Sequence, residues 1–235
     1  MLVAAAVCPC PPLLVPEVAS GAAPELDTAR AACADAVAVL AAARPDLLLV
    51  VGPADEEGRG AHHVGARGSF RGFGVDVDVR LGDGPEQDRP LPPSLAVAAW
   101  LLERTRWAAA PLEGLGVGER LDVEQCAEVG RDLAGRAERV ALLVMGDGSA
   151  CRTLKAPGYL DARAEDFDRL VARALDAADV DAMSALDPSL AYELKAAGRA
   201  PWQVLAGAAQ DAGLAGQLLY DDAPYGVGYF VAAWT

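Results

Sequence analysis

The feature that most restricts the fold is a set of three short apolar runs, each of which ends abruptly in a loop of proline, glycine or small residues. The runs cover residues 2–7, 46–51 and 140–145. Each has the length of a buried strand rather than that of a core helix. A helical stretch over 25–43 separates the first two runs, and strand, helix, strand in this order forms a βαβ unit. Such a unit requires parallel pairing with a right-handed crossover.

The rest of the chain alternates between helical and strand-like patterns. Further helices are expected at 94–107, at 122–139 with Asp122 as N-cap, in an amphipathic stretch that Asp161 caps, and at 189–197 and 201–211. Further strands are expected at 75–81, 217–221 and 227–234. No linker divides the chain, so we expect one domain over 1–235. Its expected architecture is a three-layer α/β fold, in which a mixed, mostly parallel central sheet carries helices on both faces.

The charge balance restricts the class of partner. With 34 acidic residues against 20 lysines and arginines, the formal net charge is −14. An acidic surface repels phosphate backbones, so nucleic acid is not an expected partner. No apolar run approaches the length of a membrane span, so no membrane partner is expected either. A small molecule, another protein or a second copy of the chain remain as partners.

The first residues and the cysteines bear on localisation. The start MLVAAAVC has no basic leader, and its apolar run is too short for an export signal, so we expect a cytoplasmic protein. The five cysteines are odd in number, and only Cys8 and Cys10 lie near each other in the sequence. This pattern argues against a disulfide framework, which agrees with a reducing compartment.

Ligands of open α/β sheets bind in the crevice beyond the carboxyl ends of the strands. The loops CPCPP, GPADEEG and GDGSACR follow the three apolar runs, and with the turn at 221–226 they are expected to form a cleft. This prediction rests on topology and would hold whatever residues occupied the loops. The residues expected at the cleft are Cys10, Ala54, Asp55, Asp147, Ser149, Cys151, Asp221, Asp222 and Tyr225.

These loops contain no common catalytic or metal-binding motif. Cys8-Pro9-Cys10 lacks the CxxC spacing of redox and zinc sites, and no second cysteine pair exists to complete a tetrahedral site. The glycine-rich stretch 146–149 lacks the lysine and the spacing of a P-loop. Ser149 has no histidine near it in the sequence, so no Ser-His-Asp arrangement is suggested.

The only two histidines, His62 and His63, are neighbours in a loop. Adjacent residues on an extended backbone point in opposite directions, so the pair is not expected to grip one metal ion together. An exposed loop pair is the simpler interpretation. Asp76 and Asp78 could be taken for metal ligands, but the alternation of charged and apolar residues over 75–81 explains them as the solvated face of a strand.

Four segments, taken in order, resemble a known family. VCPCPPLLVPEV, DLLLVVGPADE, GDGSACRTLKAPGYLDARAEDFDR and DAPYGVGYFVAAW are similar to the LigB-like class III extradiol ring-cleavage dioxygenase superfamily, which includes the Memo proteins. The similarity spans nearly the whole chain and is most specific over 146–169 and in the closing PYGVGY. It implies an α/β domain whose active members bind Fe(II) in the cleft.

The resemblance also implies that the iron site is degenerate. Cys10 stands where the first strand of active members supplies an iron-binding histidine, and Ala54 stands at a second such position. Ala150 occupies the position of the family's acid/base histidine, whereas Asp221 or Asp222 could match the remaining ligand. Fe(II) in these oxygenases needs two imidazoles and a carboxylate on one face. No cofactor is therefore expected, and the weak metal candidates are Cys10, His62, His63 and Asp222.

Three functional interpretations stay open. The leading one is a LigB-like protein without ring-cleavage activity, which binds a small molecule or a protein partner in the inherited cleft. The second is an active non-heme metal-dependent dioxygenase with relocated ligands, in which His62 and His63 swing into the cleft opposite Asp221 or Asp222. The third is a structural or assembly protein, for which a symmetric homo-oligomer would be the natural form.

Overall fold

The computed structural model describes residues 1–235 and has a seven-stranded mixed sheet at its centre, in the order β3-β6-β2-β7-β1-β9-β8. Strands β6, β2, β7 and β1 are parallel, while β3 and β9 run antiparallel to their inner neighbours, and β8 antiparallel to β9. The strands are β1 (Leu2–Cys8), β2 (Leu47–Ala54), β3 (Gly60–His62), β6 (Leu112–Gly118), β7 (Val140–Met145), β8 (Gly216–Asp222) and β9 (Tyr229–Trp234).

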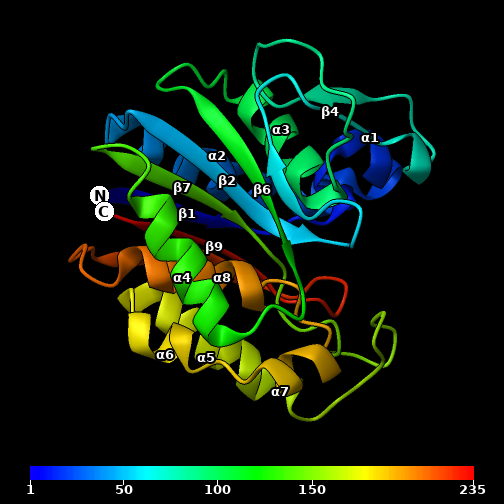
Figure 1. Cartoon of the computed structure of the whole chain (residues 1–235). Helices are drawn as coiled ribbons and strands as arrows, with labels where there is room; N and C mark the ends of the chain where they lie inside the picture. Colours follow the sequence, from blue (N-terminus) through cyan, green and yellow to red (C-terminus); the bar gives the residue numbers. More distant parts are fainter.

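Helices cover both faces of this sheet, so the predicted three-layer α/β fold is confirmed (Figure 1). One face carries α4 (Val123–Ala134), α5 (Ala164–Ala177), α6 (Val180–Ser184), α7 (Pro188–Glu193) and α8 (Arg199–Ala209). The other carries α2 (Asp27–Ala42) and α3 (Pro93–Arg104), with the short α1 (Pro16–Ala19) beside them. None of these helices has both the length and the apolar character that crossing a membrane demands.

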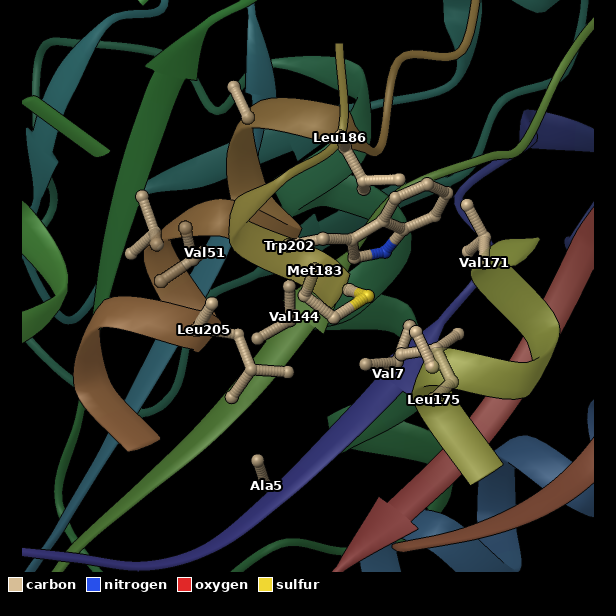
Figure 2. Close-up of a cluster of buried hydrophobic side chains, with 14 of the residues drawn as sticks. Ala5, Val7, Val51, Val144, Val171, Leu175, Met183, Leu186, Trp202 and Leu205 are labelled. Carbon is tan, nitrogen blue, oxygen red and sulfur yellow. The ribbon is translucent and has the colours of Figure 1, made fainter. Parts of the chain in front are cut away.

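The continuous apolar runs follow from this double cover. Along β1, Ala5 and Val7 belong to the core beneath α4, α5 and α8, whereas Ala4 and Ala6 belong to the core beneath α2 and α3. Figure 2 shows Ala5, Val7 and Val144 pointing from their strands towards Leu175 and Leu205 of the covering helices. A strand buried on both faces has no solvated side, so it reads as an unbroken apolar run.

Several helix boundaries differ from the sequence-based prediction. Asp122 does cap α4, since its Oδ1 accepts the Gln125 backbone N–H at 2.8 Å. The helix nevertheless ends at Ala134 rather than at residue 139, because residues 136–139 lead into β7 and the Arg139 side chain donates to backbone carbonyls before β2. The expected cap at Asp161 is wrong: its carboxylate holds Arg163, and α5 begins at Ala164 without a side-chain cap.

The strand expected at 75–81 is shorter and lies outside the main sheet. Only β5 (Asp78–Arg80) is extended, and it pairs with β4 (Arg67–Ser69) in a separate two-stranded sheet. Asp76 and Asp78 are exposed, and both accept hydrogen bonds from Arg71, at 2.8 and 2.6 Å. The interpretation of these aspartates as solvated charges is therefore confirmed.

Sequence reasoning missed β6, although it lies inside the sheet between β2 and β3. Its sequence LEGLGVG contains three glycines, which are poor strand formers. A Cβ at Gly116 would lie 2.1 Å from the carbonyl oxygen of Gly58, and one at Gly114 would lie 3.3 Å from the Cβ of His62. Glycine is needed because the segment that follows β2 crosses close over β6.

We expect Gly116→Ala to destabilise the protein by roughly 1–3 kcal/mol, since the added methyl forces the 55–60 segment away from β6. Urea unfolding followed by circular dichroism measures the change in the free energy of unfolding. Gly72→Ala is the matched control, because a Cβ there meets nothing within 4 Å. Equal stability of the two variants would contradict this account of the missed strand.

Candidate functional site

A cleft of about 420 Å³ lies where the carboxyl ends of β1, β2 and β6 meet the start of α3. These three strands are parallel, so their ends reach the same edge of the sheet. The residues that line the cleft are Cys10, Pro53, Ala54, Asp55, Arg59, Pro93, Ser94, Glu119 and Ala197. Three of the residues expected from sequence, Cys10, Ala54 and Asp55, therefore lie together.

Pro53 belongs to the loop GPADEEG that was expected at the cleft, whereas Arg59, Pro93, Ser94, Glu119 and Ala197 were not expected from sequence. Glu119 follows the missed strand β6, Ser94 begins α3, and Ala197 lies in the turn between α7 and α8. The Ser94 hydroxyl donates to the Pro53 carbonyl oxygen at 2.6 Å, which fastens the start of α3 to the end of β2. A Cβ at Gly52 would lie 2.6 Å from this same hydroxyl oxygen. The glycine after the second apolar run is thus a packing requirement.

One edge of the cleft is built around Asp147. Its Oδ1 accepts the Cys10 backbone N–H at 2.8 Å, and its backbone carbonyl accepts the Gly198 N–H at 2.9 Å. Burial raises the pKa of the Asp147 carboxyl to about 7, although the hydrogen bond from Cys10 acts in the opposite direction. This carboxyl is therefore partly protonated at neutral pH, and it holds the cleft wall without being among the lining residues.

Cys10 is buried beside this carboxyl, with 7% of its surface exposed. Burial raises the pKa of its thiol well above the ordinary value, and the neighbouring Asp147 raises it further. The thiolate is the form of cysteine that attacks electrophiles and binds metals. A thiol in these surroundings stays protonated, so Cys10 is a small apolar part of the cleft wall rather than a nucleophile.

The charged residues of the cleft are not paired with one another. Arg59 lies across the end of β6, where a Cβ at Gly118 would come within 2.8 Å of its Nε. Asp55 accepts the Gly58 backbone N–H at 3.0 Å, and Glu119 contributes its backbone carbonyl to Arg199. No ion pair joins Arg59 to Asp55 or Glu119. Their hydrogen-bonding groups remain available to a ligand that carries charge or polar atoms.

Ser149 lies outside the cleft and is fully buried. Its backbone N–H and its hydroxyl both donate to Asp168 of α5, at 2.8 and 2.7 Å, and Arg152 donates to the same carboxylate at 3.1 Å. The sequence-based placement of Ser149 at the cleft is thus corrected: it ties the loop after β7 to α5. A hydroxyl that already donates to a carboxylate, with no histidine beside it, makes no catalytic dyad.

Cys151 and Ala150 also face the interior. The Cys151 thiol contacts the Leu194 carbonyl oxygen at 3.5 Å, and the Ala150 backbone N–H donates to that same oxygen at 2.8 Å. Neither residue lines the cleft. The loop after β7 therefore runs behind the cleft and anchors the end of α7, and the expected position of Cys151 in the cleft is corrected.

The turn at 221–226 reaches the same edge of the sheet but stays apart from the cleft. Asp221 and Asp222 are exposed at the end of β8, which β9 separates from β1. Tyr225 borders a different hollow, of about 520 Å³, between the turn and the 153–155 segment. None of these three residues lines the cleft, because the antiparallel strand β9 intervenes.

His62 and His63 point in opposite directions, as expected for neighbours on an extended backbone. His63 is exposed, but His62 is buried, with Nε2 located 2.8 Å from the Gly58 carbonyl oxygen. The expectation of an exposed pair is therefore wrong for His62. Burial is also the main cause that lowers the pKa of this imidazole. Neither histidine lines the cleft.

The donor set of the cleft does not fit the iron site that the resemblance implies. Ala54 offers no lone pair, no histidine lines the cleft, and its lining holds one thiol, Cys10, and the carboxylates of Asp55 and Glu119. No group of three or more histidine, cysteine, aspartate or glutamate side chains is arranged so that it could hold a metal ion. Two imidazoles and a carboxylate on one face, which Fe(II) oxygenases need, are not provided.

We expect Asp147→Asn to change how stability depends on pH. The pKa of Asp147 is about 7 in the folded chain against an ordinary 3.8, so the folded state retains a proton that the unfolded state has lost between these values. The stability of the wild type relative to Asp147→Asn should fall as pH rises from about 4 to about 7, by on the order of 4 kcal/mol over the whole interval, and then stay level. Urea unfolding at pH 5, 6, 7 and 8 measures this difference, with the exposed Asp83→Asn as control. A difference that does not change with pH would refute the account of Asp147.

No protein-family model matches this chain, and no curated protein matches it either. The crystal structure of an uncharacterized protein, JW3007 from Escherichia coli K12, is similar to it with a TM-score of 0.53. The match covers 98% of this chain and 99% of that chain, at 14% sequence identity. At so low an identity the likeness shows a shared fold alone, and that fold extends over the whole of both chains.

Proposed function

We propose that this chain is a LigB-like protein without ring-cleavage activity, and that its cleft binds a small molecule. The observation that carries the proposal is the meeting of Cys10 and Ala54 in one cavity. These are the two positions at which the resemblance expects iron-binding histidines. The two residues are 44 positions apart in the sequence, so their convergence supports a cleft built like that of the family. Neither residue is a histidine, so the imidazole ligands of the iron site are missing.

The dimensions and chemistry of the cleft support a small-molecule ligand. Its volume of about 420 Å³ lies within the range of ligand pockets in proteins, roughly 300–1,000 Å³. Apolar surface comes from Cys10, Pro53, Ala54 and Ala197, and polar groups from Ser94, Arg59, Asp55 and Glu119. An apolar wall with a few polar groups is the usual composition of such pockets.

The interpretation with relocated ligands has less support. It requires His62 or His63 in the cleft opposite Asp221 or Asp222. His62 is instead buried against the Gly58 carbonyl, and both aspartates lie on β8, beyond β9. Bringing them together would require breaking the pairing of β3 with β6 or of β8 with β9.

The metal part of the proposal is tested by restoring imidazoles. We expect the wild type to bind no stoichiometric Fe(II) or Co(II), and Cys10→His/Ala54→His to bind Co(II) at least about tenfold more tightly, since two imidazoles then lie beside Asp55. Visible absorption of Co(II) under anaerobic conditions reports coordination, and the two single variants are the controls. One equivalent of metal on the wild type, lost in Cys10→Ala, would defeat the proposal.

The ligand part is tested by filling the cleft. A library of small fragments is screened against the wild type by saturation-transfer NMR, and we expect Ala197→Trp to abolish at least about nine-tenths of the binding signal, because the indole occupies the cavity. Ala212→Trp, beside a hollow that also contains Met1 and Leu2, is the matched control. Fragments that bind both variants equally, or none that binds the wild type, would argue against a ligand site here.

A further inference from the structure

An apolar groove of about 470 Å³ lies on the outer side of α5, away from the cleft residues. Four residues of one helical face, Arg163, Asp166, Phe167 and Leu170, form its first wall, and the spacing of three and four residues places them in line. The opposite wall comes from α6, α7 and the turn between them: Ala182, Ala185, Leu186, Asp187 and Leu190. The groove is therefore open between two helical segments.

The floor of the groove is part of the core. Phe167 and Leu186 are nearly buried, with 5% and 3% of their surface exposed. Figure 2 shows Leu186 beside Trp202 of α8, above Met183. A floor supported in this way keeps its shape without an occupant, and a preformed groove costs little ordering free energy when a partner binds.

The walls leave apolar surface uncovered. Val171 and Leu175 of α5 are buried in the core. Leu170 lies on the outer side of the same helix and is 48% exposed. Of the seven large apolar side chains that are most exposed in the molecule, five lie within residues 154–192: Leu154, Tyr159, Leu160, Leu170 and Tyr192. Of these five, Leu170 lines the groove, and with Leu190 on the opposite wall it leaves apolar surface open to a partner.

The charges around the groove select the kind of partner. Residues 161–193 contain nine aspartates and glutamates against three arginines, a net charge of −6. Arg163, the only basic residue in the groove, is already held by Asp161 and Glu193, both at 2.7 Å. Asp166 and Asp187 stand on opposite walls; Asp166 pairs with Arg169 of its own helix at 2.8 Å, and Asp187 accepts the Ser189 backbone N–H at 2.8 Å, so the excess of acidic charge comes from the segment as a whole. A basic partner is attracted here, whereas a second copy of this acidic chain or an anionic lipid surface is repelled.

We propose that this groove binds an amphipathic helix of a partner protein, with its apolar side chains in the groove and its lysines or arginines against Asp166 and Asp187. An amphipathic helix presents apolar anchors at i, i+3, i+4 and i+7, which is how helix-in-groove recognition works. The acidic walls then fix the register of the basic residues. This interaction is independent of the small molecule that the cleft is proposed to bind.

The probe is a synthetic leucine-lysine helix, Ac-LKKLLKLLKKLLKL-NH₂, labelled with fluorescein and followed by fluorescence anisotropy in about 150 mM salt. We expect micromolar binding to the wild type and a loss of at least about tenfold in Leu170→Gln/Leu190→Gln, which removes both apolar walls without altering charge. Phe73→Gln, at another exposed aromatic residue, is the control and should change affinity less than about twofold. Unchanged thermal unfolding shows that each variant is folded.

The charge requirement is measured separately. Asp166→Asn/Asp187→Asn should weaken binding several-fold at low salt and less at high salt, while Asp83→Asn/Asp88→Asn should not. In Asp187→Asn the side-chain oxygen can still accept the Ser189 N–H, as the Asp187 carboxylate that caps α7 does. The acidic peptide Ac-LEELLELLEELLEL-NH₂ should not bind.

Three results would overturn the proposal. These are no binding of the basic peptide to the wild type, equal binding to Leu170→Gln/Leu190→Gln, and a wild-type dimer in sedimentation that this variant converts to monomer. The last would identify a second copy as the occupant.

Discussion

The arrangement of the cleft depends on one residue, Asp147, which connects the ends of β1 and β7 to the start of α8. Its side chain holds the Cys10 backbone after β1, and its carbonyl holds the first turn of α8 at Gly198. A Cβ at Gly146 would lie 2.4 Å from the Gly198 Cα, so the backbones at this point are in direct contact. Burial shifts the carboxyl towards its neutral form, which makes the connection tolerable in a poorly solvated position. The Asp147 contacts and the backbone packing thus fix the position of the cleft wall. The side chains that line the cleft can be substituted without moving this wall.

Sequence patterns predicted the parts of the fold that depend on local apolar content. The run at 140–145 is β7 to the residue, and the first two runs are β1 and β2 within two or three residues at their ends. Strand β6 was not predicted, because its glycines are required by a tertiary contact. Gly58, which lies more than 50 residues earlier in the sequence, passes close over the strand. The alternation over 75–81 was real, but β5 pairs with β4 instead of joining the main sheet, and Val79 and Leu81 belong to the core beneath α3. Periodicity indicates which side chains are buried, not which neighbour buries them.

The sequence predicted where the cleft lies better than it predicted which residues line it. Topology alone placed a cleft at the carboxyl ends of the parallel strands, and Cys10, Ala54 and Asp55 lie there. Ser149 and Cys151 face the interior because they bond to Asp168 and Leu194. These partners lie 19 and 43 residues further along the chain, so local sequence did not reveal them. Arg59, Ser94 and Glu119 come from segments that no motif singled out. A motif search could not have found them, since their only common property is a place around one cavity.

The cleft and the groove share one segment, which consists of α7 and the turn that joins it to α8. Leu190 belongs to the groove and Ala197 to the cleft, and Leu194 between them accepts the Ala150 N–H and contacts the Cys151 thiol. A partner that displaced α7 would have to break this backbone hydrogen bond, and both residues are buried, so the loss would be costly. The loop after β7 therefore holds the groove in place, just as Asp147 in the same loop holds the cleft. Its backbone and side-chain contacts thus fix both regions at once.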